Sequence, residues 1–305
     1  MTSWYYPAGS TARGAWTDVI DRSIPGWLHT GLRIANLSPG DEVRMPARPA
    51  ERIVLPLAGE GFTVTTEPAN PSTAPSPAET FELAGRDGVW SGPTDFVYVG
   101  PHCAAGITGA GRIAVASAYA TRPRKASQVA ASSVAVELRG AGNASREVRN
   151  FGTPGNLDAQ SIIACEVLTP AGNWSSYPPH KHDRELAGVE TELEEIYYYE
   201  MRVAPGPVSP GRAAPLGYQR VSASDDRAID VLAEVHHGDI VLVPFGWHGP
   251  TMTAPGYDMY YLNVMAGPGR ERAWRITDHP DQAWIRQAWD SETVDPRLPF
   301  GARKP

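Results

Sequence analysis

Three histidines and a glutamate in the second half of the chain have types and spacings that suit a metal site. His180 and His182 are separated by one residue in a proline-rich segment. On an extended segment such side chains point to the same face, so both imidazoles can share one ion. Glu195 begins an apolar, aromatic run that predicts a strand, and His248 comes after the strand-like run 241–244. Three neutral imidazoles and one carboxylate suit zinc first, with manganese, iron or nickel as alternatives.

The alternative is that the histidines bind nothing. A His-x-His pair in a loop is often an ordinary surface feature. Three features favour a metal here: the pair lies in a proline-rich turn, a carboxylate begins the next strand, and a third histidine comes after an apolar strand. We therefore treat the metal site as the central hypothesis.

The composition excludes several classes of protein. The chain has 305 residues, 42% of them hydrophobic, which is enough for one large or two ordinary domains. A net charge of -7 and the lack of a lysine- and arginine-rich run argue against nucleic acid as a partner. The chain shows neither a signal peptide nor a long apolar run, so we expect no membrane partner and a cytoplasmic location. Cys103 and Cys165 have no Cys-x-x-Cys spacing, which predicts two buried, reduced thiols.

The elements that must position the metal ligands are predicted to be strands. Glycines and prolines interrupt short apolar runs at close intervals, which is typical of an all-β fold with few helices. Strand-length runs occur at residues 29–37, 52–57, 61–65, 95–99 and 111–116, and again at 161–168, 238–244 and 257–265. The site is thus expected to be built on sheets.

The rhythm of these runs suggests a duplication. The basic, proline-containing segment 121–125 predicts a linker between two domains, residues 1–125 and 126–305. A long crossover loop inside one sandwich is the alternative. The segment Val97–His102 resembles the run at residues 241–244, but the first half has no His-x-His pair. We expect two related β domains, with a degenerate metal site in the first and the active site in the second.

The segment beyond Gly267 differs in style from the strands. Trp274, Trp284 and Trp289 lie there among charged residues and turns. Aromatic residues in a terminal segment usually anchor it to the domain, so we expect packing rather than contact with a substrate.

Longer motifs in the second half resemble a known family. The His180-x-His182 pair, the strand that begins at Glu195 and the segment from Gly238 to His248 are similar to the two metal-binding motifs of cupins, which are small jelly-roll β-barrels. Four stretches closely resemble the 5-deoxy-glucuronate isomerase family of myo-inositol breakdown: Glu137–Asn143, Thr169–Asp183, Leu193–Tyr199 and Pro255–Pro268. The resemblance in the first half is loose.

This resemblance implies a bicupin, with two jelly-roll β-barrel domains in tandem. It also implies an aldose–ketose isomerase that converts 5-deoxy-D-glucuronate to 5-dehydro-2-deoxy-D-gluconate with one divalent metal ion. The implied metal ligands are His180, His182, Glu195 and His248.

The choice of glutamate leaves alternatives. Compact cupins place the glutamate only a few residues after the second histidine, whereas here residues 183–194 intervene. The competing glutamates are Glu185, Glu190, Glu192 and Glu194. We choose Glu195 because it directly precedes the Ile-Tyr-Tyr-Tyr run, which is where the family pattern places the ligand.

The implied reaction moves a proton between adjacent carbons, so the site needs a Lewis acid and a general base. The candidates for the base are Glu194, Asp183, Lys181, Asp258, Tyr257, Tyr260 and Tyr261. Of these we select Tyr257, Asp258 and Lys181. Tyr257 and Asp258 lie on a strand just after the turn that carries His248. Lys181 should point away from its flanking histidines because side chains alternate along a strand, and Glu194 should point away from Glu195 for the same reason. For each candidate a structural role is an equal alternative.

The substrate of such an isomerase is a small uronate anion, so a guanidinium should bind its carboxylate. Arg146, Arg184 and Arg220 are the candidates, and Asn173 is a candidate for the entrance of the site. Most arginines in any chain are simply solvated.

Two other functions compete with the isomerase. A metal-dependent dioxygenase would contain iron and consume oxygen, whereas a non-catalytic sugar-binding bicupin would bind its ligand without turnover. No glycine-rich loop that opens a helix is present to bind a phosphorylated substrate. The sequence leaves a homo-oligomer open.

Overall fold

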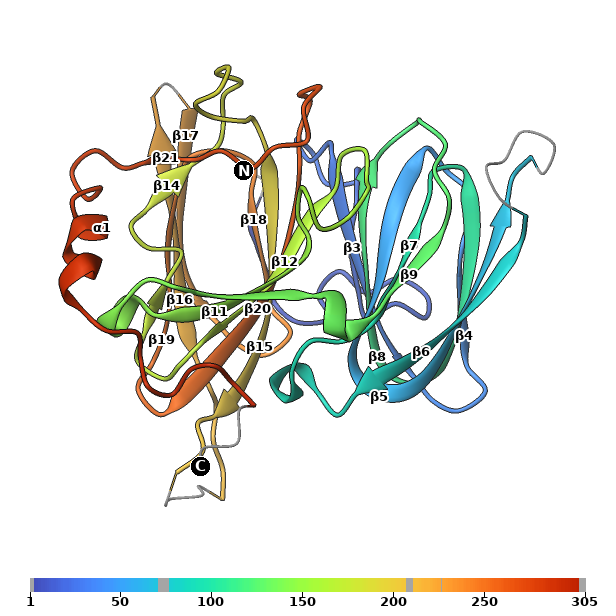
Figure 1. The fold of residues 1–305 in the computed structure, drawn as a ribbon, viewed down its shortest axis with the longest axis horizontal. Helices are drawn as coiled ribbons and strands as arrows, with labels where there is room; N and C mark the ends of the chain where they lie inside the picture. The colour runs from blue at the N-terminus through green and yellow to red at the C-terminus, as the bar shows by residue number, and fades with distance from the viewer. Residues whose placement is uncertain (1–2, 71–76, 207–210, 226, 302–305) are drawn as a thin grey trace.

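The computed structural model describes residues 3–70, 77–206, 211–225 and 227–301, and it consists mainly of β-strands in three sheets (Figure 1). The prediction of an all-β fold with few helices is confirmed. Helical segments of the described residues are the helix α1 (Ile285–Ala288) and the 3-10 turns η1 (Val89–Ser91), η2 (Ala131–Ser133), η3 (Gly142–Ala144) and η4 (Trp289–Ser291). None of the helices in these ranges has the length and apolar character needed to cross a membrane.

One 8-stranded sheet forms the barrel of the first half, on the right of Figure 1. Its strands are β2 (Asp18–Ile20), β3 (Thr30–Leu37), β4 (Glu42–Met45), β5 (Ala50–Pro68), β6 (Glu79–Arg86), β7 (Phe96–Val99), β8 (Cys103–Tyr119) and β9 (Ser127–Val129). The order is β2-β3-β8-β5-β7-β9, with β4 beside β8 and β6 beside β5. The long strands β5 and β8 shift register between Pro56 and Ala58. At this shift a Cβ on Gly111 would lie 2.1 Å from the Ala58 carbonyl oxygen, so glycine is required there.

Two sheets form the second half, on the left of Figure 1. The 7-stranded sheet has the order β1-β18-β15-β20-β12-β11-β10. Its strands are β1 (Tyr5–Tyr6), β10 (Ala135–Arg139), β11 (Arg146–Gly152), β12 (Ile163–Thr169), β15 (Glu194–Val203), β18 (Ile240–Val243) and β20 (Tyr257–Ala266). The 6-stranded sheet has the order β17-β16-β19-β14-β21, with β13 beside β19. Its strands are β13 (Trp174–Ser175), β14 (His180–Lys181), β16 (Gly217–Ser224), β17 (Arg227–Val235), β19 (Trp247–Thr253) and β21 (Thr277–Asp278).

The 7-stranded sheet is buried on both faces, which explains why its strands are almost continuously apolar. On one face Tyr197 and Tyr199 pack inside the second barrel together with Val221 of the facing sheet. On the other face Ile196 and Tyr198 pack against the first half of the chain. The strand β15 therefore delivers alternate side chains to the interior of the second barrel and to the contact between the halves.

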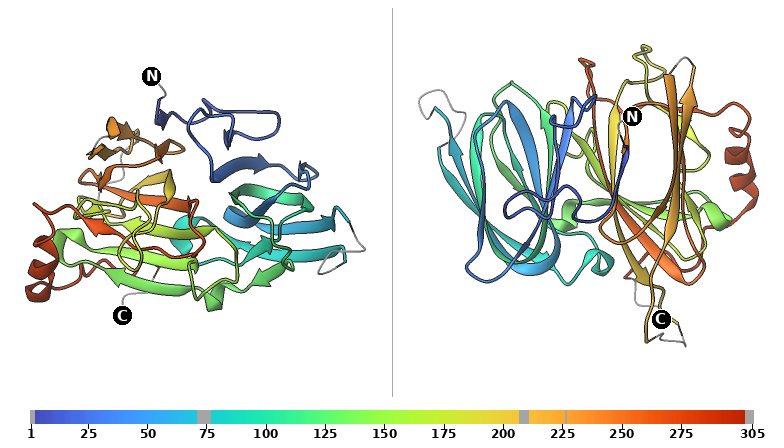
Figure 2. Two further views of the ribbon diagram at one scale, coloured as in Figure 1. Left: turned by 90° about the horizontal axis from the view of Figure 1, so that it is seen from above. Right: turned by 180° about the vertical axis from the view of Figure 1, so that it is seen from behind.

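Strands and ion pairs connect the two halves of the chain, which lie side by side in Figure 2. β1 near the N-terminus pairs with β18, and β9, which lies after residue 125, pairs with β7. Arg112 of β8 donates two hydrogen bonds, of 2.8 and 2.7 Å, to Glu200 of β15. The division of the chain at residue 125 stays a prediction. The 7-stranded and the 8-stranded sheets each contain one strand from the other side of that division, β1 and β9.

Candidate metal centre and active-site cavity

The strands of the second barrel bring the three histidines together. His180 lies on β14 and His248 on the neighbouring β19, and the two residues are direct partners in the register. The ring centroids of His180 and His248 are 4.4 Å apart, and those of His182 and His248 are 4.6 Å apart. All three side chains are buried, and one ring nitrogen from each lies within 4.8 Å of the others. This three-histidine group can hold a divalent metal ion.

Glu195 completes the group from the opposite sheet. It is the second residue of β15, and its Oε2 lies 3.0 Å from His182 Nε2 and 3.2 Å from His248 Nε2. The preceding Glu194 points the other way, as alternation predicts, and accepts hydrogen bonds from the backbone N–H groups of residues 28–30. Among the competing glutamates, Glu190 binds Lys181 instead. Glu195 is therefore the glutamate that faces the histidines.

Backbone carbonyl groups fix the orientation of the imidazoles. The Nδ1 atom of His180 lies 3.3 Å from the carbonyl oxygen of Pro178. The corresponding distance is 3.0 Å from His182 to Leu193 and 3.1 Å from His248 to Gly246. A proton on each Nδ1 would be donated to that carbonyl and would leave Nε2 free as a ligand. The Nε2 atom of His248 is buried and makes no hydrogen bond to any described residue. A cation bound among the imidazoles would satisfy this otherwise orphaned atom.

The electrostatics of the metal-free cluster differ from one ligand to the next: they favour an ionised Glu195 and a neutral His180, but a protonated His182. Burial would raise the pKa of Glu195, but the hydrogen bond with His182 and the close approach of the His182 and His248 rings together outweigh it and lower the pKa to about 2. Burial, together with repulsion from the other two histidines, lowers the pKa of His180 well below its ordinary value. Burial also opposes a charge on His182, yet the hydrogen bond to Glu195 raises its pKa. Near neutral pH the group thus contains an ionised carboxylate and a neutral His180.

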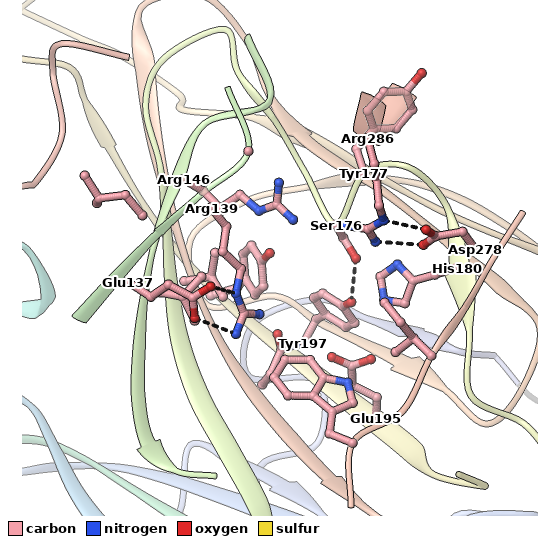
Figure 3. Close-up of a pocket in the computed structure, with 18 of the residues that line it drawn as sticks. Glu137, Arg139, Arg146, Ser176, Tyr177, His180, Glu195, Tyr197, Asp278 and Arg286 are labelled. Atoms are coloured by element: carbon pink, nitrogen blue, oxygen red, sulfur yellow. Dashed lines mark hydrogen bonds and ion pairs between the residues drawn. The ribbon is translucent and has the colours of Figure 1, made fainter. Parts of the chain in front are cut away.

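A cavity of about 520 Å³ opens beside the cluster, and Figure 3 shows His180 and Glu195 on its wall. Three guanidinium groups line it. Arg139 is paired with Glu137, and Arg286 is paired with Asp278. The remaining lining includes Ser176, Tyr177, Tyr197, Tyr261, Asn263, Trp274 and Trp289. The lining thus contains three guanidinium groups and three carboxylates, those of Glu137, Glu195 and Asp278, and aromatic rings form part of the wall.

Arg146 differs from the other two arginines of the cavity. Its side chain is buried, and burial lowers its pKa to about 10, which leaves it charged near neutral pH. Its Nη1 donates to the carbonyl of Ala144, and it forms no salt bridge within the described part of the chain. A buried guanidinium with free donors on a cavity wall is suited to bind an anionic ligand.

The C-terminal segment supplies a carboxylate next to the histidines. Asp278 of β21 is the register partner of His180 on β14, so both side chains project from the same face. Arg286 holds the Asp278 carboxylate through both of its oxygens. Figure 3 shows Asp278 beside His180 at the cavity wall.

The three candidates selected for the base lie elsewhere, whereas Tyr261, a member of the wider set, lines the cavity. The Lys181 Nζ points away from the histidines and bonds to Asp183 at 2.7 Å and Glu190 at 2.9 Å. Asp258 accepts hydrogen bonds from Arg202 and from the N–H of residue 171, and Tyr257 is half-buried at the start of β20. None of the three is on the wall of the cavity.

Of the four residues predicted to contact the substrate, one lies at the cavity and three do not. Arg146 is on the cavity wall, whereas Arg184 pairs with Asp225 at the surface and Arg220 pairs with Asp230. Asn173 is buried, and its amide donates to the carbonyl of Ser145 and to Asp295. Arg184, Arg220 and Asn173 do not line the cavity. The sequence analysis missed Asp278, Arg139 and Arg286, although Arg139 lies within one of the four stretches that resemble the isomerase family.

Comparisons with known proteins agree with this architecture. A crystal structure of an IolB-like protein from Salmonella typhimurium LT2 matches with a TM-score of 0.78 and 33% identity over 93% of this chain and 99% of that one. The oxalate decarboxylase of Lactobacillus farciminis matches with a TM-score of 0.57 at 9% identity, over 91% of this chain and 89% of that one. At that identity the likeness concerns the fold alone. The prediction of a bicupin is confirmed.

Several relatives known by sequence are named 5-deoxy-glucuronate isomerase. The 5-deoxy-glucuronate isomerase of Geobacillus kaustophilus (strain HTA426) is 38% identical over 269 residues, which are 86% of this chain and 88% of that one. The model of the KduI/IolB family matches residues 4–285. Because this match spans nearly all of both halves, the chain belongs to the KduI/IolB family.

Proposed function

We propose that this protein is a metal-dependent aldose–ketose isomerase that converts 5-deoxy-D-glucuronate to 5-dehydro-2-deoxy-D-gluconate in myo-inositol breakdown. The name of the relatives supports the reaction. The observation that carries the proposal is a buried cluster of three histidines and one glutamate that reaches the wall of a cavity through His180 and Glu195. The same wall carries Arg146, which has no salt bridge to any described residue. Such a cavity suits a small sugar acid.

The metal is proposed to be zinc, with manganese, iron or nickel as alternatives. His180, His182, His248 and Glu195 would hold it. When bound, the metal would act as a Lewis acid that makes the carbon next to the substrate's carbonyl group more acidic. The backbone carbonyls at the three Nδ1 atoms keep the imidazoles in position for this task.

Arg146 is proposed to bind the carboxylate of the substrate. It forms no salt bridge among the described residues, whereas Arg139 and Arg286 are occupied by Glu137 and Asp278. A charge-assisted pair between a buried guanidinium and a carboxylate is strong and fixes orientation. The aromatic walls of the cavity would exclude water from the bound sugar.

Asp278 is proposed to carry the proton between the two carbons. It is a cavity carboxylate beside His180, and Arg286 holds it in one orientation. A base must lie within hydrogen-bonding reach of the proton that it removes. The roles assigned to Lys181, Tyr257 and Asp258 from the sequence stay predictions, and their positions away from the cavity favour Asp278 instead.

Proton exchange followed by NMR tests the function. Purified protein is mixed with the uronate in heavy water, and exchange at the carbon next to the aldehyde is measured before and after chelation. We expect exchange to stop on chelation and to return with one divalent metal. Arg146→Gln should raise KM roughly 10–100-fold with metal content unchanged. Asp278→Asn should lower kcat by about 10²–10⁴-fold.

The same preparation separates the competing functions. A dioxygenase would consume oxygen and require iron, and a sugar-binding protein would bind the uronate without exchange. Either result, obtained with metal-loaded protein, would reject the isomerase.

A further inference from the structure

One open end of the first barrel, here called its mouth, is the end at which Arg52 lies. It corresponds to the end of the second barrel that contains the metal centre. In the second barrel Glu195 pairs with Val243, the last residue of β18, and with Met265 of β20. In the first barrel Arg52 pairs with Val99, the last residue of β7, and with Ser117 of β8. Arg52 therefore stands at the position equivalent to the glutamate that faces the histidines.

The neighbouring residues support this correspondence. Glu194, just before Glu195, accepts backbone hydrogen bonds from three successive residues, 28–30, of the first half. Glu51, just before Arg52, accepts backbone hydrogen bonds from three successive residues, 160–162, of the second half. Each barrel thus has an outward glutamate that binds the other half, and the next residue points inward at the barrel's own mouth. Only the sign of the inward charge differs.

The first mouth has no set of metal ligands. Within the described ranges, the histidine group of the second barrel is the one cluster of at least three groups able to hold a metal. His102, in the turn after β7, is exposed. A guanidinium at the position of the ligand carboxylate would repel a cation. The predicted degenerate metal site is thus consistent with this geometry, and the reversed charge suggests a different ligand.

Arginines dominate a cavity of about 530 Å³ at this mouth. Six of them line it: Arg13, Arg22, Arg33, Arg44, Arg48 and Arg52. Asp21 is the one acidic residue of the lining, and it is shared between Arg13 at 2.9 Å and Arg33 at 3.4 Å. This excess of positive charge is notable because the whole chain has a net charge of -7. The local field attracts anions.

Two of these arginines are partly withdrawn from water. Arg52 is only 5% exposed, and its Nη1 and Nη2 donate to the carbonyls of Cys103 and Pro46 at 2.8 and 2.7 Å. Burial lowers the pKa of both Arg52 and Arg33. Arg52 has no carboxylate partner among the residues that the structure describes, so an anion in the cavity would supply the missing countercharge.

We propose that the cavity at the mouth of the first barrel binds a small dianion, either a phosphate or a dicarboxylate. Guanidinium groups form paired hydrogen bonds with both kinds of oxyanion. Arg33 and Arg52 bind the oxygen atoms of the anion that lie at the inner end of the cavity, and the exposed Arg48 binds those near the rim. This site is independent of the isomerase reaction and of its metal.

Binding is measured by isothermal titration calorimetry on metal-loaded, full-length protein with two probes at matched ionic strength, inorganic phosphate and succinate. Acetate serves as the singly charged reference. We expect phosphate or succinate to bind at one site per chain and at least about tenfold more tightly than acetate. The stronger of the two probes identifies the source of the oxyanions.

Matched variants locate the site. Arg33→Gln and Arg48→Gln should each weaken binding of the stronger probe by about tenfold or more. Arg212→Gln removes the same charge from an exposed position outside both cavities and should have no effect. Arg146→Gln should also leave this binding unchanged, which separates it from binding in the second barrel. Circular dichroism shows whether each variant is folded. If Arg33→Gln does not fold, Arg48→Gln still tests the site, because Arg48 is exposed.

Three results would overturn the proposal. The first is a lack of binding by either dianion, and the second is equal weakening by Arg48→Gln and Arg212→Gln. The third is a concentration-dependent dimer, detected by light scattering, that Arg48→Gln abolishes while neither probe binds. In that case the cavity would hold an acidic segment of a second copy.

Discussion

Glu194 and Glu195 are adjacent on β15 but point to opposite faces of the sheet, so each serves as the control for mutation of the other. Glu195 faces the histidines, whereas Glu194 binds the backbone of residues 28–30. We expect Glu195→Gln to weaken metal binding by more than about 100-fold, since changes at groups that only support a ligand already cost about 10–100-fold. Glu194→Gln should keep the metal but lower the free energy of unfolding by roughly 1–3 kcal/mol. Metal titration and urea denaturation distinguish the two outcomes, and equal metal loss in both variants would contradict them.

The lowered pKa of Glu195 predicts how the metal-free protein responds to acid. Its pKa falls from the ordinary 4.5 to about 2 on folding, so its contribution to stability is complete above about pH 4.5 and is lost as the pH falls toward 2. The contribution is on the order of 3 kcal/mol. The difference in unfolding free energy between chelated wild type and Glu195→Gln should therefore shrink from pH 5 to pH 3. A constant difference in urea denaturation at both pH values would refute this assignment.

At the level of residues, the sequence indicated the metal cluster better than the rest of the site. His180 and His182 were predictable because spacing along a strand determines which side chains share a face. Glu195 was chosen by its place directly before the Ile-Tyr-Tyr-Tyr run, where the family pattern has its ligand. Arg146 was one of three arginine candidates, because no local pattern distinguishes a buried guanidinium from a solvated one. Asp278 was not predicted, because its proximity to His180 depends on the pairing of two strands almost 100 residues apart. Local sequence patterns do not encode such long-range pairings.

Among the elements, β14 is only two residues long and depends on side-chain contacts behind it. Lys181 lies between its two histidines on the opposite face and joins Asp183 and Glu190. Lys181→Met would leave the buried Glu190 without its cation, whereas Asp183 would keep its salt bridge to Arg227. We expect a loss of about 3–5 kcal/mol in stability, because a broken buried ion pair leaves an uncompensated charge. The histidine strand should also become mobile, with weaker metal binding. Thermal unfolding and metal titration measure both effects.

Lys125→Met is the control for this change, because Lys125 is exposed and lies outside the site. It should alter neither stability nor metal affinity. A Lys181→Met protein with the stability and metal affinity of the wild type would show that β14 is held by its backbone pairing alone.

The apolar runs predicted where strands lie more successfully than where each strand begins and ends. Residues 29–37 correspond to β3 and residues 257–265 to β20, but 52–57 and 61–65 belong to the single strand β5. The glycines between these two runs were interpreted as a turn, whereas in the structure they accommodate a register shift within one continuous strand. The tail was expected to provide packing only, yet its Trp274 and Trp289 form part of the cavity wall.

Across the whole molecule, the two halves share one hydrophobic core. Ile53 and Leu55 of the first barrel belong to the same buried cluster as Ile196 and Leu262 of the second. The buried Arg86 of β6 pairs with Glu166 of β12, and the outward glutamates of both barrels bind the backbone of the opposite half. We expect a single cooperative unfolding transition, with the same midpoint by circular dichroism and by tryptophan fluorescence.

This shared core predicts that the second half cannot replace the whole chain, even though it contains every residue of the metal centre. A fragment of residues 126–305 would expose the apolar face of the 7-stranded sheet and would lose β1, which pairs with the edge strand β18. Exposed apolar surface of this extent favours aggregation. We expect the fragment to aggregate or to bind a hydrophobic dye, and to recover metal binding only when it is co-expressed with residues 1–125. A soluble fragment that binds metal as tightly as the full chain would mean that the first half contributes nothing to the fold of the second, and its function would then have to lie in its own arginine-lined cavity.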